Sequence, residues 1–504
     1  MTAAFRLFTE AAGNAMLETA GLTCRMGGKV MIRFGTGGWR AVIGDEFIRS
    51  NIQLLAKALS VKMKREGKAQ EGIVLGYDRR FLSKESMRWC GEVFAAEGIH
   101  SFMVNKSSPT PLIMFYVMTH SLSYGLMVTA SHNPAIYNGI KVFTAGGRDA
   151  DRETTQEIEQ IAEGITPESI QTIPYEQALE EGLIEEIYPL NEYLDDIIGK
   201  IDMDAIKRAR LRVALDPMYG VSEIPLKTLL LTARCDVETI HDSHDTLFGG
   251  RMPAPNAGTM RQLITRVMDY GFNIGIATDG DADRLGVIDD TGRYLRANDV
   301  LVLLYYYLIR YKGMHGAVVR NVATTHMLDR IAERFSEKCY EVPVGFKYIS
   351  AKMRETDALL GGESSGGLTV RGHINGKDGI YAAMLLIEMI AVTGRNISGI
   401  YNEIEKECGS IYMEERDYRM TQERKEYLKE VLYEKKELPE FPFECDHLSY
   451  MDGVKVYFRN GGWAVVRFSG TEPLLRVFCE MPRQEDAVSV CGIIEDYLEL
   501  QAGR

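Results

Sequence analysis

Short apolar runs, each followed by small or charged polar residues, recur along the first 410 positions of this 504-residue chain. They form three successive pairs, which are GIVLGYDRRFLS (from Gly72) with GLMVTASHNP (from Gly125), RVALDPMYGVS (from Arg212) with NIGIATDGDADR (from Asn273), and AVVRNVATTHML (from Ala317) with ALLGGESSGG (from Ala358). A continuous apolar run that ends in turn residues predicts a buried parallel strand, and the amphipathic stretches between the runs predict helices. The pattern therefore predicts three related α/β domains.

The second run of each pair ends in a polar loop. Ligands of parallel sheets gather outside the carboxyl ends of the strands. We therefore expect the three loops to contribute to one shared site. Ordinary turn chemistry explains any one of these loops equally well when that loop is considered alone.

The character of the chain changes after Tyr412. The charged segment EERDYRMTQERKEYLKEVLYEKKELPEF predicts a solvent-exposed helix and a linker. The following VKVYFRNGGWAVVRFSGTEPLLRVFCE and a final helix predict a small α+β domain. We place boundaries near residues 190, 300 and 410, which gives domains 31–190, 191–300, 301–410 and 411–504.

The bulk composition narrows the class of protein. Hydrophobic residues make up 45% and charged residues 26% of the chain, as in soluble globular proteins. No apolar run approaches the ~20 residues of a membrane span, and the N-terminus lacks the apolar segment of a secretory signal. The net charge of -13 argues against nucleic-acid binding but not against a small anionic substrate. The eight cysteines are scattered without a C-x-x-C pair, which favours reduced thiols in a cytoplasmic protein.

The first polar loop, TASHNP, places Ser131 just after a predicted strand. Pro134 prevents the strand from continuing, and a hydroxyl in such a loop can carry a phosphoryl group if a base and a cation are supplied. A serine that caps the next helix is the simpler alternative for this loop alone. Because adjacent side chains of an extended chain point to opposite faces, we expect His132 to be a poor base for Ser131 and to have a structural role.

The second loop, TDGDADR, carries Asp279, Asp281 and Asp283 at alternate positions. Extended backbone would place the three carboxylates on one side, where they can bind a hard cation. An EF-hand calcium loop is excluded, because Arg284 occupies its glycine position and Asp290 its final glutamate position. A haloacid-dehalogenase-type phosphotransferase, with Asp279 as the nucleophile, stays open as an alternative.

The third loop, GGESSGG, places Glu363 and Ser365 among glycines. Glutamate and serine supply an acceptor and a donor for sugar hydroxyls, and the glycines let the backbone approach a ligand closely. The run FGTGGWRAVIGDEF near Met31 lacks both G-x-G-x-x-G and a Walker lysine, which argues against dinucleotide or ATP binding.

A fourth loop, RFSGTEPLLR, follows a predicted strand near the C-terminus. Ser469, Gly470 and Thr471 can offer hydroxyl and backbone N–H groups to an anion, while Arg467 and Arg476 can add charge-assisted bonds to phosphate. Surface arginines beside an ordinary turn are the alternative.

In this order, TASHNP, DGDADR, the G-E-x-S-G loop and the S-G-T loop resemble the α-D-phosphohexomutase superfamily over almost all of the chain from Met31 onward. The resemblance implies three related α/β domains plus a C-terminal α+β phosphate-binding domain, heart-shaped around a central cleft. It also implies hexose phosphates as substrates, Mg²⁺ as cofactor, and a phosphoserine that donates to the sugar phosphate. Glucose 1,6-bisphosphate would be the intermediate and activator.

The resemblance also assigns roles to single residues. Ser131 matches the phosphoserine, and its phosphate together with Asp279, Asp281 and Asp283 matches the metal site. Lys141 matches the general acid/base, and Arg40 and Arg284 match basic residues near the transferring group. The substrate-binding positions are Lys347, Glu363, Ser365, Arg467, Ser469, Gly470, Thr471 and Arg476, of which Ser469, Thr471 and Arg476 lie in the loop for the distal phosphate. The four domains would thus carry, in order, the catalytic serine, the metal loop, the sugar loop and the distal-phosphate loop.

The choice of sugar depends on two departures from members that act on both mannose and glucose. Where those members have histidines, this chain has Gly367 in one loop and Phe346 with Lys347 in the other. The runs VGFKYI and GHINGKDG are closer to phosphoglucomutases, so we expect a phosphoglucomutase that acts as a monomer or a small homo-oligomer. A phosphomannomutase, a phosphoglucosamine mutase, a glucose 1,6-bisphosphate synthase and an inactive sugar-phosphate-binding homologue stay open.

The resemblance begins abruptly at MIRFGTGGWR. We therefore expect residues 1–30, with a short helix near Phe5 to Leu17, to lie outside the working enzyme, and Met31 to be the natural start. A genuine extension that docks on the first domain or mediates oligomerisation is the alternative.

Overall fold

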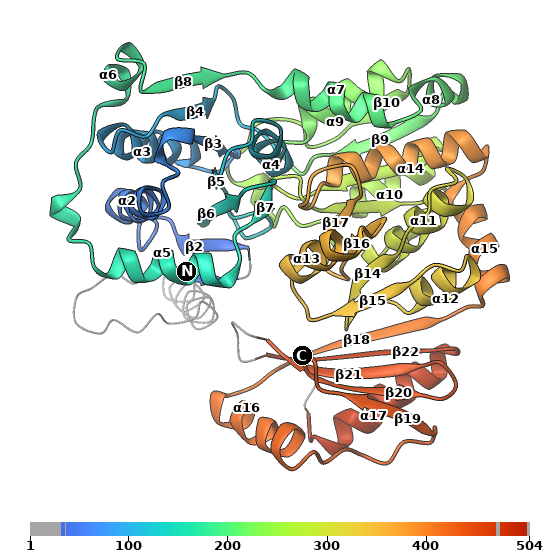
Figure 1. The fold of residues 1–504 in the computed structure, drawn as a ribbon. Coiled ribbons are helices and arrows are strands. Elements are labelled where there is room, and N and C mark those ends of the chain that lie inside the picture. Colours follow the sequence, from blue (N-terminus) through green and yellow to red (C-terminus); the bar gives the residue numbers. More distant parts are fainter. Residues whose placement is uncertain (1–31, 36, 470–473, 501–504) are drawn as a thin grey trace, which may run out of the picture. The chain divides into compact units, whose positions relative to one another are not determined.

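The computed structural model describes residues 32–35, 37–469 and 474–500, which form two compact units. One unit contains residues 32–413 with 480–484, and the other contains the described residues of 414–479 and 485–500. Figure 1 shows the elements in sequence colours. The expectations for residues 1–30 lie outside the described residues.

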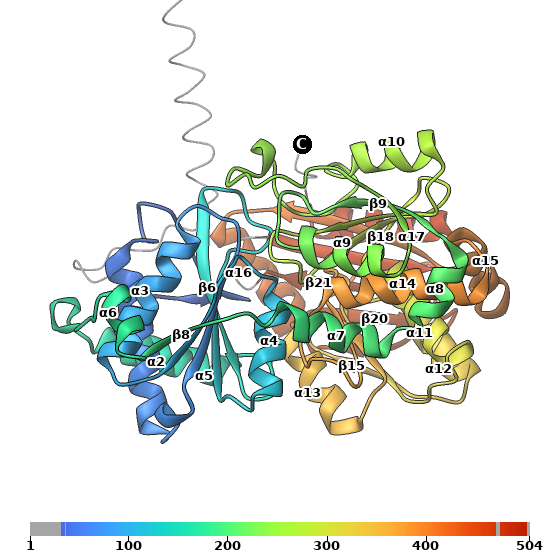
Figure 2. The ribbon, with the colours of Figure 1, turned by 90° about the horizontal axis from the view of Figure 1, so that it is seen from above.

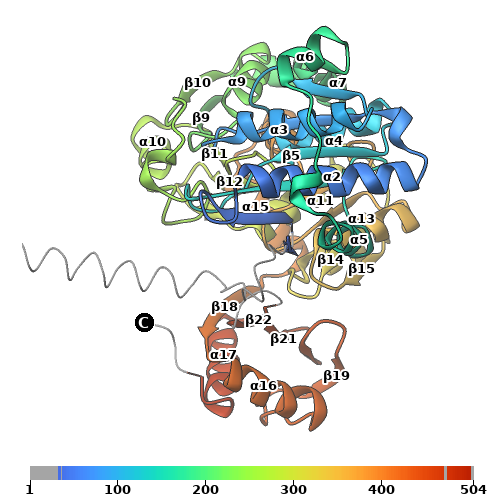
Figure 3. The same cartoon turned by 90° about the vertical axis from the view of Figure 1, so that its left-hand side faces the viewer.

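The first α/β domain is built on an eight-stranded sheet with the order β1-β2-β6-β5-β3-β4-β8, in which β7 pairs with β6. Its strands are β1 (Phe34–Gly35), β2 (Gly38–Val42), β3 (Ile73–Tyr77), β4 (Ser101–Val104), β5 (Tyr124–Val128), β6 (Tyr137–Thr144), β7 (Arg148–Asp149) and β8 (Ile184–Ile187). Its helices are α2 (Arg49–Arg65), α3 (Ser83–Ala96), α4 (Thr110–Thr119), α5 (Arg152–Glu163) and α6 (Tyr175–Glu180), with single turns at Ala69–Glu71 and Pro167–Ser169. Helices α3 and α4 pack on this sheet (Figure 2), and α2 packs against α3 (Figure 3).

The second domain has a five-stranded sheet with the order β10-β9-β11-β12-β13. Its strands are β9 (Arg212–Asp216), β10 (Asp236–Thr239), β11 (Ile274–Thr278), β12 (Leu285–Ile288) and β13 (Tyr294–Leu295). Its helices are α7 (Leu190–Lys200), α8 (Met203–Ala209), α9 (Glu223–Thr232) and α10 (Arg261–Tyr270), with a single turn at Phe248–Gly250.

The third domain has a four-stranded sheet with the order β15-β14-β16-β17. Its strands are β14 (Val318–Asn321), β15 (Cys339–Val342), β16 (Leu360–Gly362) and β17 (Leu368–Val370). Its helices are α11 (Ala297–Arg310), α12 (Met327–Arg334), α13 (Phe346–Thr356), α14 (Gly379–Thr393) and α15 (Ile397–Cys408).

The three sheets repeat one topology. In each of them three parallel strands are followed by an antiparallel return strand, in the orders β4-β3-β5-β6, β10-β9-β11-β12 and β15-β14-β16-β17. The two apolar runs of each predicted pair are neighbouring parallel strands, which confirms that prediction. Each polar loop joins the last parallel strand to the return strand, so the three loops occupy equivalent places in the three repeats.

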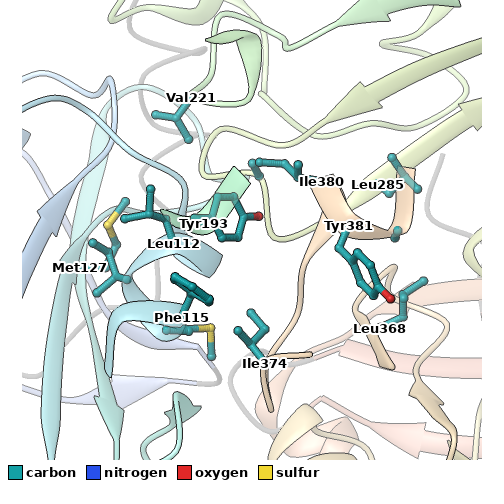
Figure 4. Packing of buried hydrophobic residues seen from close by; sticks show 14 of the residues in the cluster. Leu112, Phe115, Met127, Tyr193, Val221, Leu285, Leu368, Ile374, Ile380 and Tyr381 are labelled. Carbon is teal, nitrogen blue, oxygen red and sulfur yellow. The ribbon is translucent and has the colours of Figure 1, made fainter. Parts of the chain in front are cut away.

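A single apolar core joins the three α/β domains into one unit. Figure 4 shows Leu112 and Phe115 of α4 on one side, Ile380 and Tyr381 of α14 on the other, and Tyr193 of α7 between them. The rings of Phe115 and Tyr193 meet edge to face with centroids 5.7 Å apart. Helix α14 is buried from Gly379 through Ile390 and is apolar on all sides except at Glu388, which pairs with Lys312, as expected of a helix surrounded by other elements.

The C-terminal domain has a five-stranded sheet with the order β18-β22-β21-β20-β19. Its elements are β18 (Tyr412–Arg419), β19 (Cys445–Ser449), β20 (Val454–Phe458), β21 (Trp463–Phe468), β22 (Leu474–Met481), α16 (Gln422–Lys429), a single turn at Glu430–Glu434 and α17 (Gln484–Tyr497). The expected α+β domain is therefore confirmed.

The sequence predicts only a helix and a linker in the charged segment after Tyr412, and this prediction is wrong for the first residues of the segment. Residues 412–419 form strand β18 at the edge of the sheet, and Tyr418 is its buried residue. An edge strand tolerates many charged side chains, so charge alone does not indicate a helix.

Among the described residues no single helix is long and apolar enough to cross a membrane; α14 and α15, bent by 81°, meet that test only as a pair. Cys90, Cys235, Cys339, Cys408, Cys445 and Cys491 are free thiols.

Candidate active site

The loop between β5 and β6 holds Ser131 in a buried and strained position. Ser131 is 1% exposed, and its φ of 52° lies in the left-handed region that non-glycine residues rarely adopt. Its hydroxyl donates a hydrogen bond of 2.6 Å to Oδ2 of Asp279. The first and second polar loops, which are far apart in sequence, therefore meet at the predicted serine.

The left-handed backbone changes the expected geometry of His132. We expected an extended chain to point His132 away from Ser131, and this is wrong, because His132 Nδ1 lies 3.4 Å from Ser131 Oγ. Burial, together with the positive charges of Arg284 and Arg40, lowers the pKa of His132 to about 2. The imidazole is therefore neutral near pH 7. Its predicted structural role stays a prediction.

The loop between β11 and β12 brings Asp279, Asp281 and Asp283 together. Each is buried, and one oxygen from each lies within 4.8 Å of the others. The convergence was predicted, but the extended backbone was not correct, because the chain turns after Thr278 and Ala282 has a φ of 63°. A turn, rather than the alternation of side chains along a strand, therefore brings the three carboxylates together.

Lysines from the first and third repeats neutralise these aspartates. Lys141 on β6 donates hydrogen bonds to Oδ2 of Asp281 at 2.6 Å and to Oδ2 of Asp283 at 2.7 Å. Lys377, which precedes α14, places its Nζ 3.0 Å from the same oxygen of Asp283. All three repeats therefore supply charged groups to one cluster.

Burial and neighbouring charges set the protonation of this cluster. Burial and the negative charges of Asp281 and Asp283 raise the pKa of Asp279 well above its usual range. For Asp283, burial is outweighed by the positive charges of Lys141 and Lys377, which hold its pKa well below the usual range. For Lys141, burial is outweighed by Asp281 and Asp283, which raise its pKa above the ordinary value. Lys141 is therefore a cation here.

The aspartates fit a hard cation such as Mg²⁺. Oδ1 of Asp281 and Oδ1 of Asp283 are buried and have no hydrogen-bond partner among the described residues. Buried carboxylate oxygens normally have partners, and oxygen ligands are what Mg²⁺ prefers. Three convergent carboxylates with two unused oxygens are therefore a suitable donor set.

Arg40 on β2 and Arg284 after the aspartates add positive charge. Arg40 donates a hydrogen bond of 2.6 Å to Oδ1 of Asn133 in the serine loop. The backbone N–H of Arg284 donates to Oδ1 of Asp279 at 3.0 Å. The Nε atoms of both arginines are buried without a hydrogen-bond partner among the described residues, and burial and the charge of Arg284 lower the pKa of Arg40. Two neighbouring guanidinium groups with unused donors suit an anion.

The loop between β16 and β17 contains Glu363 and Ser365. The carboxylate of Glu363 accepts hydrogen bonds from Ser365 Oγ at 3.0 Å and from Asn321 Nδ2 at 3.4 Å. The same loop approaches the second repeat, because a Cβ placed on Gly366 would lie 3.9 Å from the Cβ of Arg284. Lys347 lies in the first turn of α13, with Nζ 5.1 Å from the centre of the Tyr348 ring.

The candidate phosphate loop belongs to the C-terminal domain. Arg467 donates a hydrogen bond of 3.0 Å to Asp452, and Nε of Arg476 lies 3.4 Å from Asp417. The backbone N–H of Ser469 donates to the carbonyl of Leu474 at 2.8 Å. Gly470 and Thr471 lie outside the described residues.

Sequence reasoning missed three residues at this site. Thr110 Oγ1 donates to Asp281 Oδ2 at 2.6 Å, and Lys377 pairs with Asp283. Arg80 hydrogen-bonds the serine loop. The run GHINGKDG was a signal for Lys377, whereas no pattern around Thr110 pointed to the aspartates.

Sequence models of the phosphoglucomutase/phosphomannomutase family match four consecutive stretches of the chain. Alpha/beta/alpha domain I matches residues 31–169, domain II residues 191–292, domain III residues 296–408, and the C-terminal domain residues 418–494. The matches therefore follow the order of the three repeats and the last domain.

Individual proteins agree with the family match. A phosphoglucomutase/phosphomannomutase of Thermococcus kodakarensis is 29% identical over 93% of this chain and 97% of its own. A probable phosphoglucosamine mutase of Methanopyrus kandleri is 30% identical over 75% and 79%. The structure of a putative phosphomannomutase from Thermus thermophilus superposes with a TM-score of 0.80 at 27% identity, over 93% and 99%. The chain therefore belongs to the phosphoglucomutase/phosphomannomutase family of the α-D-phosphohexomutase superfamily.

Proposed function

We propose that the protein interconverts glucose 1-phosphate and glucose 6-phosphate, with Ser131 as the phosphoryl carrier and glucose 1,6-bisphosphate as intermediate and activator. Phosphohexomutase activity, an isomerisation of sugar phosphates, follows from the family. The glucose preference and the residue roles are the proposed part. The observation that carries the residue roles is the 2.6 Å contact of Ser131 Oγ with Asp279, because it puts a phosphoryl group on Ser131 beside the aspartate cluster.

The chemistry is a phosphoryl transfer in two mirrored halves. In the first half the bond from phosphorus to Ser131 Oγ breaks while a bond forms from phosphorus to the free hydroxyl of the sugar phosphate. That hydroxyl loses its proton, and Ser131 Oγ gains one. In the second half the other phosphate of the bisphosphate returns to Ser131. The released sugar phosphate then carries its phosphate at the other of the two positions.

The neighbouring charges suit this transfer. Lys141 is a cation that donates hydrogen bonds to Asp281 and Asp283, in the same cluster as the Asp279 that Ser131 contacts. We therefore assign it to proton donation at Ser131 Oγ and to proton removal in the reverse half. The unused donors of Arg40 and Arg284 can bind the oxygens of the transferring group. Mg²⁺ held by the aspartates would neutralise charge on that group.

One feature of the third repeat, the crowding beside Gly367, supports glucose as the sugar. We assign Glu363 and Ser365 to the sugar hydroxyls and Lys347 to the substrate. A Cβ on Gly367 would lie 2.2 Å from Cδ of Lys377, whose Nζ is held by Asp283. A histidine at position 367, as in dual-specificity members, would therefore displace Lys377.

The remaining phosphate needs cations of its own. We assign Arg467, Ser469, Gly470, Thr471 and Arg476 to binding the phosphate that is not transferred. Hydroxyl groups and arginines beside a turn are suitable donors for a phosphate dianion.

A coupled assay tests the function directly. Glucose, mannose and glucosamine 1-phosphates are compared at equal concentration with Mg²⁺ and the matching 1,6-bisphosphate as primer. The highest kcat/KM is expected for glucose 1-phosphate, and equal values for glucose and mannose would contradict the proposal. Net accumulation of bisphosphate would indicate a synthase, and binding without turnover an inactive homologue.

Glucosamine phosphate is the second candidate, because a relative at 30% identity is named a probable phosphoglucosamine mutase. Glucosamine differs from glucose by an amine at C2, which is a donor and needs an acceptor. The buried carboxylate of Glu363 is the acceptor that the third loop offers. A kcat/KM higher for glucosamine 1-phosphate than for glucose 1-phosphate would favour this candidate.

A further inference from the structure

We propose that Arg80 is a positioning residue that holds Ser131 in the orientation required for phosphoryl transfer. This inference rests on the proposed role of Ser131. Arg80 follows β3 and lies 51 positions before the serine, and its side chain is fully buried. Among the described residues Arg80 forms no hydrogen bond or ion pair with Asp279, Asp281 or Asp283, and only its charge acts on Asp281 and Asp279. Arg80→Lys keeps that charge, so this variant tests the contacts of Arg80 with the backbone of the serine loop.

The two terminal nitrogens of Arg80 donate their described hydrogen bonds to one loop. Nη1 donates to the carbonyls of Pro134 and Tyr137, both at 3.0 Å, and Nη2 donates to the carbonyls of Ser131 and Asn133, both at 2.7 Å. Four hydrogen bonds from one planar group to a stretch of seven consecutive residues fix the curvature of that loop. A lysine has one flexible nitrogen and cannot reproduce this planar arrangement.

The other side of Ser131 is held through Asp78. The backbone N–H of Ser131 donates to Thr129 Oγ1 at 2.8 Å, and Thr129 Oγ1 donates to Asp78 Oδ2 at 2.7 Å. Asp78 Oδ2 also lies 3.3 Å from Nε of Arg80. The N–H and the carbonyl of Ser131 are thus both linked to one buried ion pair.

This arrangement explains how a strained serine is maintained. A left-handed non-glycine residue costs about 1 kcal/mol or more and persists only where its surroundings determine it. The hydrogen bonds of Ser131 with Thr129 and Arg80 hold its backbone in the left-handed conformation. In this conformation Oγ of Ser131 points at Asp279. Arg80 also stacks over the ring of Phe248 from the second repeat, at 4.9 Å, which fixes the arginine between the two domains.

The experiment compares Arg80→Lys with Arg79→Lys. Arg79 is the matched control: it is buried and also reaches the second repeat, where it donates to Glu223 at 3.1 Å and to the carbonyl of Asp242, and it makes no described bond to residues 129–137. Two quantities are measured, the rate at which labelled glucose 1,6-bisphosphate phosphorylates Ser131 and the steady-state kcat and KM for glucose 1-phosphate.

Arg80→Lys is expected to lower the labelling rate and kcat by about 10- to 100-fold, since small misplacements of a nucleophile have effects of that size. KM should stay within about threefold of wild type, because the substrate-binding residues are untouched, and Arg79→Lys should stay within about threefold in kcat and labelling rate. Labelling of Arg80→Lys at the wild-type rate overturns the inference, as does an equal loss in Arg79→Lys. If wild-type protein turns over without label on Ser131, the proposed function fails instead.

A second pair of variants decides the matter if Arg80→Lys does not fold. Thr129→Val removes the hydroxyl that joins Ser131 to Asp78, while Thr129→Ser keeps it. Thr129→Val is expected to slow labelling about tenfold with KM little changed, and Thr129→Ser to restore most of the rate. Equal labelling rates for Thr129→Val and wild type would overturn the inference.

Discussion

Ser131 Oγ lies 2.6 Å from Asp279 Oδ2, although 148 positions separate the two residues. The contact joins the first repeat to the second at equivalent loops, each between a parallel strand and its return strand. A fold that repeats one topology can therefore bring unlike chemical groups to one place. The proposed nucleophile comes from one repeat, the proposed metal ligands from another, and a neutralising lysine from the third.

Ser131→Ala is expected to lower mutase activity by at least about 10³-fold, because the variant lacks the proposed phosphoryl carrier and the other hydroxyl of TASHNP, Thr129 Oγ1, is held by Asp78 and the backbone of residue 131. Labelled bisphosphate and peptide mapping should place the label on Ser131 in wild-type protein. Ser169→Ala, at an exposed serine, is the control and should keep full activity. Label on Asp279 would support the aspartyl-phosphate alternative.

Removal of Mg²⁺ should abolish turnover, and added Mg²⁺ should restore it. Binding to the native protein is also expected to stabilise it by about 2.7 kcal/mol at a Mg²⁺ concentration 100 times Kd. Asp281→Asn should lose this stabilisation and about 10²-fold in activity, whereas Asp269→Asn, at an exposed position, should behave as wild type. Full activity of Asp281→Asn in chelator would show that the metal assignment is wrong.

The affinity for Mg²⁺ should rise with pH. Burial and the charges of Asp281 and Asp283 raise the pKa of Asp279 well above its usual range, so protons compete with Mg²⁺ for this carboxylate at higher pH than for an ordinary aspartate. Calorimetric titrations at pH 6 and pH 8 should therefore give a lower Kd at pH 8, with proton release on binding. A Kd that does not change with pH would contradict this expectation.

Gly367→Ala is expected to lower kcat/KM for glucose 1-phosphate by about tenfold. The added Cβ would meet Cδ of Lys377 at 2.2 Å, and movement of that lysine would disturb its ion pair with Asp283. Gly399→Ala on α15 is the matched control, because its Cβ would enter open space. Equal losses in the two variants would remove the argument that Gly367 acts through Lys377.

The sequence was informative where one loop carries the chemistry. Asp279, Asp281 and Asp283 are local in sequence, so their convergence could be predicted even though a turn rather than a strand produces it. The left-handed φ of Ser131 could not be predicted, because the contacts that impose it come from Arg80 and Thr129 after folding. Residue type does not reveal such a conformation.

Contacts between residues far apart in the sequence and the strand at the edge of a sheet also could not be predicted from the sequence. Lys377 meets Asp283 only because the third repeat packs on the second, and the pairing has no local sequence pattern. Strand β18 was interpreted as a helix and linker because its charges are as dense as those of a solvated helix. The repeated strand pairs, by contrast, are buried on both faces, and their continuous apolar runs have few other interpretations.

His373 provides a pH-dependent contribution to stability that can be measured without substrate. It is buried between α7 and the start of α14: Nε2 lies 2.6 Å from Asp378 Oδ2, and Nδ1 lies 3.4 Å from Asp196 Oδ2 and 3.3 Å from Lys200 Nζ. Burial alone would lower the pKa of His373, and Lys200 acts in the same direction, but the hydrogen bonds to Asp196 and Asp378 outweigh both and raise it.

A histidine whose pKa is raised on folding stabilises the native state fully below its unfolded pKa, and this contribution is lost as pH rises through the folded value. His373→Gln is therefore expected to lower the melting temperature more at pH 6 than at pH 9, by the equivalent of about 1–3 kcal/mol at the lower pH. His447→Gln, at an exposed histidine in the C-terminal domain, is the control and should show little effect at either pH. If His373→Gln lost the same stability at both pH values, the imidazole would contribute through packing rather than charge, and the contacts with Asp196 and Asp378 would not raise its pKa on folding.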